Sequence, residues 1–117
     1  MERKFEEYFA EYCRIKYDAT YNIRKVLKLR VGQVYIRWDE MPLSMQWGIL
    51  QDFFLENRLL VEIRTVDDWN TWVFQIFTED CMAPFFHVET SEEYGSINEA
   101  RTAAFEKAKQ LYEQRTK

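Results

Sequence analysis

The residues that could carry out catalytic chemistry centre on His87, the single histidine of this 117-residue chain. It lies in the stretch FFHVET, where strand-like alternation would place it on the same face as Glu89. A histidine–carboxylate pair can act as a general base, and Cys81, six residues earlier, is a conceivable nucleophile. Nucleophilic catalysis also needs an orienting group and a cleft, for which the sequence gives no pattern. We therefore expect a half-buried strand histidine and no enzyme.

Metal, nucleotide and cofactor sites also lack the residues they need. Cys13 and Cys81 are far apart, and with one histidine they cannot complete a closed zinc site. The chain contains neither a P-loop nor a G-x-G-x-x-G fingerprint. Solvated turns explain the paired carboxylates at the expected ends of elements: Asp39-Glu40, Asp67-Asp68, Glu79-Asp80 and Glu92-Glu93. The sequence therefore predicts no cofactor and no metal, and two free thiols in a reducing compartment.

A basic stretch between residues 24 and 37 is the candidate for binding nucleic acid. Its five cations could share one face of a hairpin, with aromatic residues for stacking on bases: Arg24, Lys25, Lys28, Arg30 and Arg37. A sequence-independent nucleic-acid binder needs a basic surface, because it must neutralise phosphates. The chain has a net charge of −4, and residues 31–98 alone carry 3 Lys/Arg against 12 Asp/Glu, a net charge of −9. We therefore keep nucleic-acid binding as the alternative function.

The aromatic stretch TWVFQIF, residues 71–77, indicates a binding surface. As a strand it carries large apolar side chains on both faces, whereas helices on one side of a sheet cover only one face. The predicted interface residues are Trp69, Trp72, Val73, Phe77 and Phe86. Either the N-terminal helix covers the second face, through Phe5, Phe9 and Tyr12, or a partner does. The main prediction is a non-enzymatic protein-interaction module that binds a partner protein or a second copy of itself, as a homodimer.

Residues 26–39, VLKLRVGQVYIRWD, are the best candidate for a β-hairpin. Apolar residues alternate with polar ones on both sides of Gly32-Gln33, and glycine at the first central position suits a type II′ turn. In the competing interpretation, a helix that starts at residue 2 continues to about Leu29 and ends at Gly32. We favour the hairpin, with the helix confined to residues 2–17, but the pattern leaves open whether 18–31 is helix or strand.

From residue 42 onward the pattern predicts a helix, three antiparallel strands and a second helix. The expected ranges are 43–57, 59–66, 71–79, 85–90 and a last helix that starts at Ser96. Ser96 and Glu99 form an S-x-x-E capping box, and small residues such as Ala100 and Ala104 then allow close packing on a sheet. The predicted fold class is α+β: an N-terminal helix and a short β-hairpin followed by helix–three antiparallel strands–helix, with the helices packed on one sheet.

The length of the chain limits its organisation. A chain of 117 residues has room for one core, so we predict a single domain, residues 1–117, made of parts 1–41 and 42–117. No apolar run approaches the roughly 18–20 residues of a membrane span. The N-terminal stretch MERKFEEYFAEY is charged and lacks the apolar run of a signal peptide. We therefore expect a cytoplasmic protein with no membrane partner.

The predicted unit from Leu43 to Tyr112 resembles the double-stranded-RNA-binding domain. The last helix of that family follows an entry of the type G-S-x-x-E-A-x-x-A-A, matched here by Gly95, Ser96, Glu99, Ala100, Ala103 and Ala104. The family holds phosphates with a lysine cluster at the start of this helix. This chain has Ile97, Asn98 and one cation, Arg101, in that region. The resemblance therefore implies the topology and not the RNA-binding function.

A second resemblance covers about residues 43–112. The stretch MQWGILQDFFLENRLLVEIRTVDDWNTWVFQIF, together with SINEARTAAFEKAKQL, is similar to a group of small uncharacterised proteins encoded by gut bacteria, their phages and mobile elements. These proteins share a Trp-containing helix, an I-x-V/I-E-I-like strand, an aromatic strand and a terminal helix of the type Y/S-x-x-E-A-x-x-A-x-x-E/K-A. The resemblance implies an accessory protein of a phage or mobile element, without implying a reaction.

Overall fold

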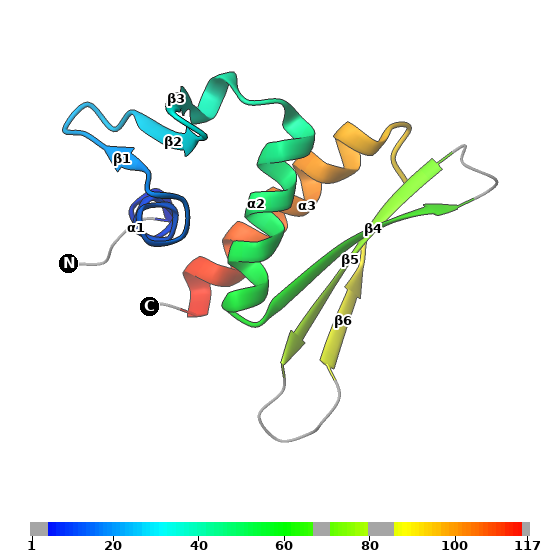
Figure 1. The fold of residues 1–117 in the computed structure, drawn as a ribbon. Helices are drawn as coiled ribbons and strands as arrows, with labels where there is room; N and C mark the ends of the chain where they lie inside the picture. Colours follow the sequence, from blue (N-terminus) through cyan, green and yellow to red (C-terminus); the bar gives the residue numbers. More distant parts are fainter. Residues whose placement is uncertain (1–4, 67–70, 80–85, 116–117) are drawn as a thin grey trace. The chain divides into compact units, whose positions relative to one another are not determined.

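The structure is a computed structural model that describes residues 5–66, 71–79 and 86–115. Within these ranges the fold is α+β, which confirms the predicted class (Figure 1). Its elements in chain order are α1 (Phe5–Tyr17), β1 (Thr20–Tyr21), β2 (Leu27–Val31), β3 (Val34–Arg37), the short 3-10 helix η1 (Trp38–Glu40), α2 (Leu43–Glu56), β4 (Leu59–Val66), β5 (Thr71–Glu79), β6 (Phe86–Thr90) and α3 (Ile97–Arg115). The order is the predicted one, with β1 and η1 as additions.

The chain divides into two compact units, residues 1–48 and 49–117, with the boundary inside α2. The sequence suggested a division after residue 41, and a single domain over residues 1–117 stays a prediction. Each unit has its own three-stranded antiparallel sheet, β1-β2-β3 in the N-terminal unit and β4-β5-β6 in the C-terminal unit. The expected three-strand sheet is the C-terminal one, while the hairpin gains β1 and forms a second sheet.

Residues 27–37 form the predicted hairpin rather than the end of a helix. Val31 pairs with Val34 across the two-residue turn Gly32-Gln33. Gly32 has φ +64°, while the φ of Gln33 is not positive, which is the sign pattern of a type II′ turn. Such a turn matches the right-handed twist of the two strands. The apolar and polar residues that alternate in the sequence therefore lie on opposite faces of the sheet.

α1 ends at a sharp reversal that the sequence pattern does not reveal. Asp18 has φ +52°, in the left-handed region, and the N–H of Ala19 donates to the carbonyl of Cys13 at 3.3 Å. The chain thereby leaves the helix and forms β1, where Thr20 pairs with Lys28 of β2. Aspartate tolerates the left-handed conformation better than most residues, so it serves here as the helix stop.

The core of the N-terminal unit forms between α1 and its sheet. Phe5, Phe9 and Cys13, spaced by four residues, are buried along one side of α1, and this helix packs against β1 and β2. Leu29 of β2 is buried, and the ring of Phe9 meets that of Trp38 edge-on, with centroids 5.0 Å apart. Of the three residues that the sequence suggested as a cover for a sheet face, Phe5 and Phe9 are buried, and Cys13 is a further buried residue of this helix.

The core of the C-terminal unit forms between α3 and the strands β4 and β5. Val61 of β4 pairs with Ile76 of β5, and both side chains are almost completely buried. Ala100, Ala104 and Ala108 of α3 are fully buried, and α3 packs against both strands. Residues four apart share a helix face, so a stripe of methyl groups lets the helix approach the sheet closely. The predicted small-residue face is therefore confirmed.

The start of α3 is the predicted capping box. The N–H of Glu99 donates to Oγ of Ser96 at 3.1 Å, and the Glu99 carboxylate accepts the N–H of Gly95 at 3.1 Å. The two side chains therefore satisfy backbone donors that the first helical turn leaves unpaired.

α2 begins at Leu43, as expected. The carbonyl of Pro42 accepts the N–H groups of Met45 and Gln46 at 3.0 Å, and Ser44 lies inside the first turn. The second half of α2 packs on α3 through two ring contacts, Phe53 with Tyr112 at 5.3 Å and Phe54 with Phe105 at 6.2 Å. These contacts complete the core of the C-terminal unit.

Close packing of α3 on its sheet gives a stability prediction. Ala104→Leu should lower the free energy of unfolding by about 1–3 kcal/mol, because the larger side chain forces the helix away from the strands. Gln110→Leu, at an exposed position of the same helix, should change it by less than about 0.5 kcal/mol. Urea unfolding followed by circular dichroism measures both variants. Equal effects would show that α3 is not closely packed at Ala104.

Candidate binding surface

The catalytic candidates of the sequence do not form a described site. Cys81 and the side chains of His87 and Glu89 lie outside the described residues, although the backbone of His87 pairs with Thr78 in the sheet. Cys13 is completely buried in the core, and burial raises the pKa of its thiol to about 12. In the part of the chain that the structure describes, no group of three His, Cys, Asp or Glu residues could hold a metal ion.

The five residues predicted as a protein interface do not share one face of the sheet. Trp69 lies outside the described residues, and so does the side chain of Phe86. Val73 and Phe77 alternate with Trp72 along β5, so Trp72 is on the opposite face from the other two. Val73 is buried and Phe77 is half-buried, so neither is an exposed apolar residue. Their binding of a partner stays a prediction.

Three of the five predicted cations do share one face of the N-terminal sheet. Lys28 is directly opposite Arg37, and Arg30 is directly opposite Tyr35, so the four residues lie on the same face. Leu29 between them is buried on the other face, where α1 packs. Each of the four is exposed, Tyr35 at 47%. We call Lys28, Arg30, Tyr35 and Arg37 the basic face. Tyr35 was not predicted as a site residue.

Two cations of the basic face have carboxylate neighbours. Arg30 donates to Asp18 at 2.9 Å, and this hydrogen bond is the main cause that raises the pKa of Arg30. Arg37 donates to Asp39 at 3.0 Å. Both pairs are open to solvent, so each contributes little to folding and its arginine can exchange partners. No described acidic side chain pairs with Lys28.

The other two predicted cations, Arg24 and Lys25, lie in the turn between β1 and β2. The side-chain oxygen of Asn22 accepts the N–H groups of Arg24 and Val26 at 3.0 and 3.1 Å. The N–H of Lys25 donates to the Asn22 carbonyl at 2.9 Å, and Lys25 has φ +61°, which glycine adopts more easily. Ile23 is 97% exposed in the same turn. We call Ile23, Arg24 and Lys25 the hairpin tip. It is the tip of the β1–β2 hairpin and not the Gly32-Gln33 turn between β2 and β3.

Exposed apolar residues gather in the same unit. Of the eight large hydrophobic residues that are exposed in the described part of the chain, seven lie between residues 15 and 45: Ile15, Ile23, Val31, Val34, Tyr35, Leu43 and Met45. The eighth, Leu55, belongs to the C-terminal unit. Residues 20–37 also contain five Lys/Arg and no Asp/Glu. The N-terminal unit therefore combines exposed apolar side chains with exposed cations.

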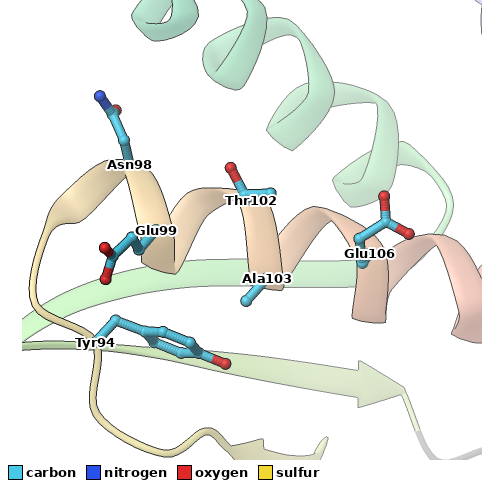
Figure 2. Close-up of a pocket in the computed structure, with 6 residues that line it drawn as sticks. All are labelled: Tyr94, Asn98, Glu99, Thr102, Ala103 and Glu106. Carbon is cyan, nitrogen blue, oxygen red and sulfur yellow. The ribbon is translucent and has the colours of Figure 1, made fainter.

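The C-terminal unit has an open hollow on α3, shown in Figure 2. It holds about 480 Å³ and is lined by Tyr94, Asn98, Glu99, Thr102, Ala103 and Glu106. The Tyr94 ring lies below the helix, next to the small side chain of Ala103 (Figure 2). The Glu99 carboxylate already accepts a hydrogen bond in the capping box. The lining includes no histidine or cysteine.

Comparisons with known proteins leave the function to be argued from the structure. Neither a protein-family model, nor a curated protein, nor a solved structure matches the chain. The resemblances to the double-stranded-RNA-binding domain and to accessory proteins of phages and mobile elements therefore stay predictions. Among the described helices, none is both long and apolar enough to cross a membrane.

The backbone of the hairpin tip gives a testable prediction. Lys25→Gly should raise the free energy of unfolding by about 0.5–1 kcal/mol, because glycine adopts a positive φ without a steric penalty. Lys25→Ala is the matched control, since it removes the same charge and keeps a Cβ atom, and it should not stabilise the protein. Urea unfolding compares the three proteins. A glycine variant no more stable than the alanine variant would contradict the left-handed conformation of Lys25.

The burial of Cys13 gives a second prediction. The rise of its pKa from 9.0 to about 12 lowers the thiolate fraction at pH 8 roughly a thousandfold, so the native protein should react very slowly with iodoacetamide. A Cys81→Ser background leaves Cys13 as the single thiol, and the same protein in urea provides the fast reference rate. Rapid alkylation under native conditions would contradict the place of Cys13 in the core.

Proposed function

We propose that this protein is a non-enzymatic protein-interaction module whose N-terminal unit binds an acidic partner protein. The proposal is carried by the concentration of exposed apolar residues in that unit, which holds seven of the eight in the described part of the chain. Contiguous exposed apolar residues mark interaction sites, and Val31 and Val34 stand side by side at the hairpin turn. The basic face and the hairpin tip lie in the same unit, and residues 20–37 carry no acidic residue, so the complementary partner surface is acidic.

The residue types of the basic face suit a protein partner. Arginine and tyrosine are enriched in protein interfaces, and Arg30, Tyr35 and Arg37 stand together here. The two arginines already contact carboxylates, those of Asp18 and Asp39, which aspartates or glutamates of a partner can replace. Because both pairs are solvent-exposed, such a replacement costs little free energy.

A catalytic function has less support, and the biological setting rests on resemblance. The buried thiol of Cys13, with its raised pKa, is a poor nucleophile. The role that we propose, an accessory protein of a phage or mobile element, rests on the similarity over residues 43–112 alone. It specifies the kind of protein and not the surface that binds a partner.

Nucleic-acid binding is the second candidate, and one observation favours it. Lys28, Arg30 and Arg37 share a face with Tyr35, so phosphate contacts and base stacking could come from one surface. A phosphate backbone gains nothing from the exposed apolar residues of the same unit, such as Val34, whereas a protein partner can bury them. Nucleic acid therefore ranks below an acidic protein.

Affinity capture of the tagged full chain from a bacterial lysate, with and without nuclease, separates the two candidates. We expect a stoichiometric protein partner that survives nuclease. Lys28→Glu should reduce its recovery by about tenfold or more, because the substitution sets like charges against each other. Arg14→Glu is the matched control: it changes the net charge equally, lies on α1 at an exposed position, and should change recovery by less than about twofold.

Two results would contradict the proposal. Nucleic acid in the eluate, or a partner set that disappears with nuclease, would move the conclusion to the second candidate. Equal losses from Lys28→Glu and Arg14→Glu would show that net charge, and not the basic face, governs binding. Circular dichroism of both variants establishes that each remains folded.

A further inference from the structure

β3 is an outer edge of the N-terminal sheet, because the strand order is β1-β2-β3. Val31 and Val34 flank the two-residue turn and therefore form a hydrogen-bonded pair. Bonded and non-bonded pairs alternate along an antiparallel ladder. Ile36 is thus the next residue of β3 that bonds to β2, whereas the N–H and C=O groups of Tyr35 and the N–H of Arg37 point toward the free edge. The carbonyl of Arg37 belongs to the start of η1, because Arg37 is the N-cap residue of that helix.

The other side of β2 supports this assignment. The N–H of Asn22 donates to the carbonyl of Val26 at 3.4 Å, so alternation makes Thr20 and Lys28 the next bonded pair. The backbone groups of Lys28 then point to β1 and away from Arg37, which lies opposite on β3. Within the described ranges, no strand or loop pairs with the outward backbone groups of β3.

An edge strand of the C-terminal sheet has a side-chain hydrogen bond to its backbone, unlike β3. β4 is also an edge strand, but the side-chain amide of Gln51 in α2 donates to the carbonyl of Val61 at 2.9 Å. This contact occupies an edge acceptor, one of the ways in which proteins protect exposed strands from pairing. No described side chain bonds to the backbone of β3 in this way.

The side chains of β3 define the chemistry of an added strand. On one face, alternate side chains of that strand would lie beside Tyr35 and Arg37, and on the other beside Val34 and Ile36. Carboxylates suit the first set, because residues 20–37 contain five cations and no acidic residue. Apolar side chains suit the second, where Val34 is 59% exposed. The matching strand therefore alternates acidic and apolar residues.

We propose that the free edge of β3 receives an extended acidic segment of the partner protein as a fourth strand. Backbone hydrogen bonds to Tyr35 and Arg37 hold the segment in register, as in other cases of strand addition. Its carboxylates contact the basic face, including Lys28 on the neighbouring strand. This inference rests on the proposed function and states the form in which the partner binds.

A peptide experiment on the full chain tests strand addition. The probe is acetyl-Glu-Val-Glu-Val-Glu-amide, and the control is acetyl-Lys-Val-Lys-Val-Lys-amide. At saturating acidic probe, amide hydrogen exchange followed by NMR should slow by about tenfold or more at Tyr35 and Arg37, because their N–H groups gain acceptors. Exchange at Val34 and Ile36, which already bond to β2, should change by less than about twofold. The lysine peptide should not slow exchange at Tyr35 or Arg37.

Matched variants complete the test. Arg37→Glu should weaken binding of the acidic probe by about tenfold or more, whereas Arg14→Glu should weaken it by less than about twofold. Unchanged exchange at Tyr35 and Arg37, or equal binding of the two peptides, would overturn strand addition. A partner captured through Lys28 without slower exchange at those two amides would also overturn it, while the proposed function would stand.

Discussion

The register of the β2–β3 hairpin is the constraint on which the N-terminal surface depends. Gly32 adopts φ +64°, which lets two residues close the turn and sets Val31 opposite Val34. Because side chains alternate along a strand, a slip of one residue would move each side chain to the other face. Leu29 would then leave the core and the cations would enter it. The turn therefore causes both the burial of this leucine and the exposure of the basic face.

α1 supplies the second requirement, a cover for the apolar face of the sheet. Its buried residues Phe5, Phe9 and Cys13 lie on the side that packs against β1 and β2. With one face covered, the other can carry polar residues, as antiparallel sheets commonly do. Asp18 at the end of α1 and Asp39 in η1 then orient the two arginines of that face. Both carboxylates flank the sheet closely in sequence, so the basic face is organised locally.

The sequence predicts those elements whose patterns are long enough to recognise. The hairpin is predictable because polar and apolar residues alternate on both sides of Gly32, and α3 because Ser96 and Glu99 mark its start. β1 has two residues, too few for a periodicity. The stop at Asp18 and the turn at Lys25 use left-handed conformations without the glycine that usually signals them.

The sequence predicts the cations of the candidate surface but not how the strands arrange them. The sequence identifies all five cations, but it cannot show that the turn sets Arg24 and Lys25 apart at the hairpin tip. Tyr35 is missed, although its alternation along β3 places it on the basic face. Trp72 and Val73 are both predicted as interface residues, and the alternation along the strand already places them on opposite faces. Residue type thus selects the candidate residues, and the register of the strands shows which of them share a face.

The shortness of β3 decides what kind of partner its edge can hold. Of its four residues, Tyr35 and Arg37 alone present outward backbone groups, and each hydrogen bond contributes only about 0.5–1.5 kcal/mol net. Short edge strands resist indiscriminate pairing for this reason. The affinity for an added strand must therefore come largely from side chains on the basic face. Since that face is cationic, an acidic segment gains binding energy that a neutral or basic segment lacks, and the short edge becomes selective.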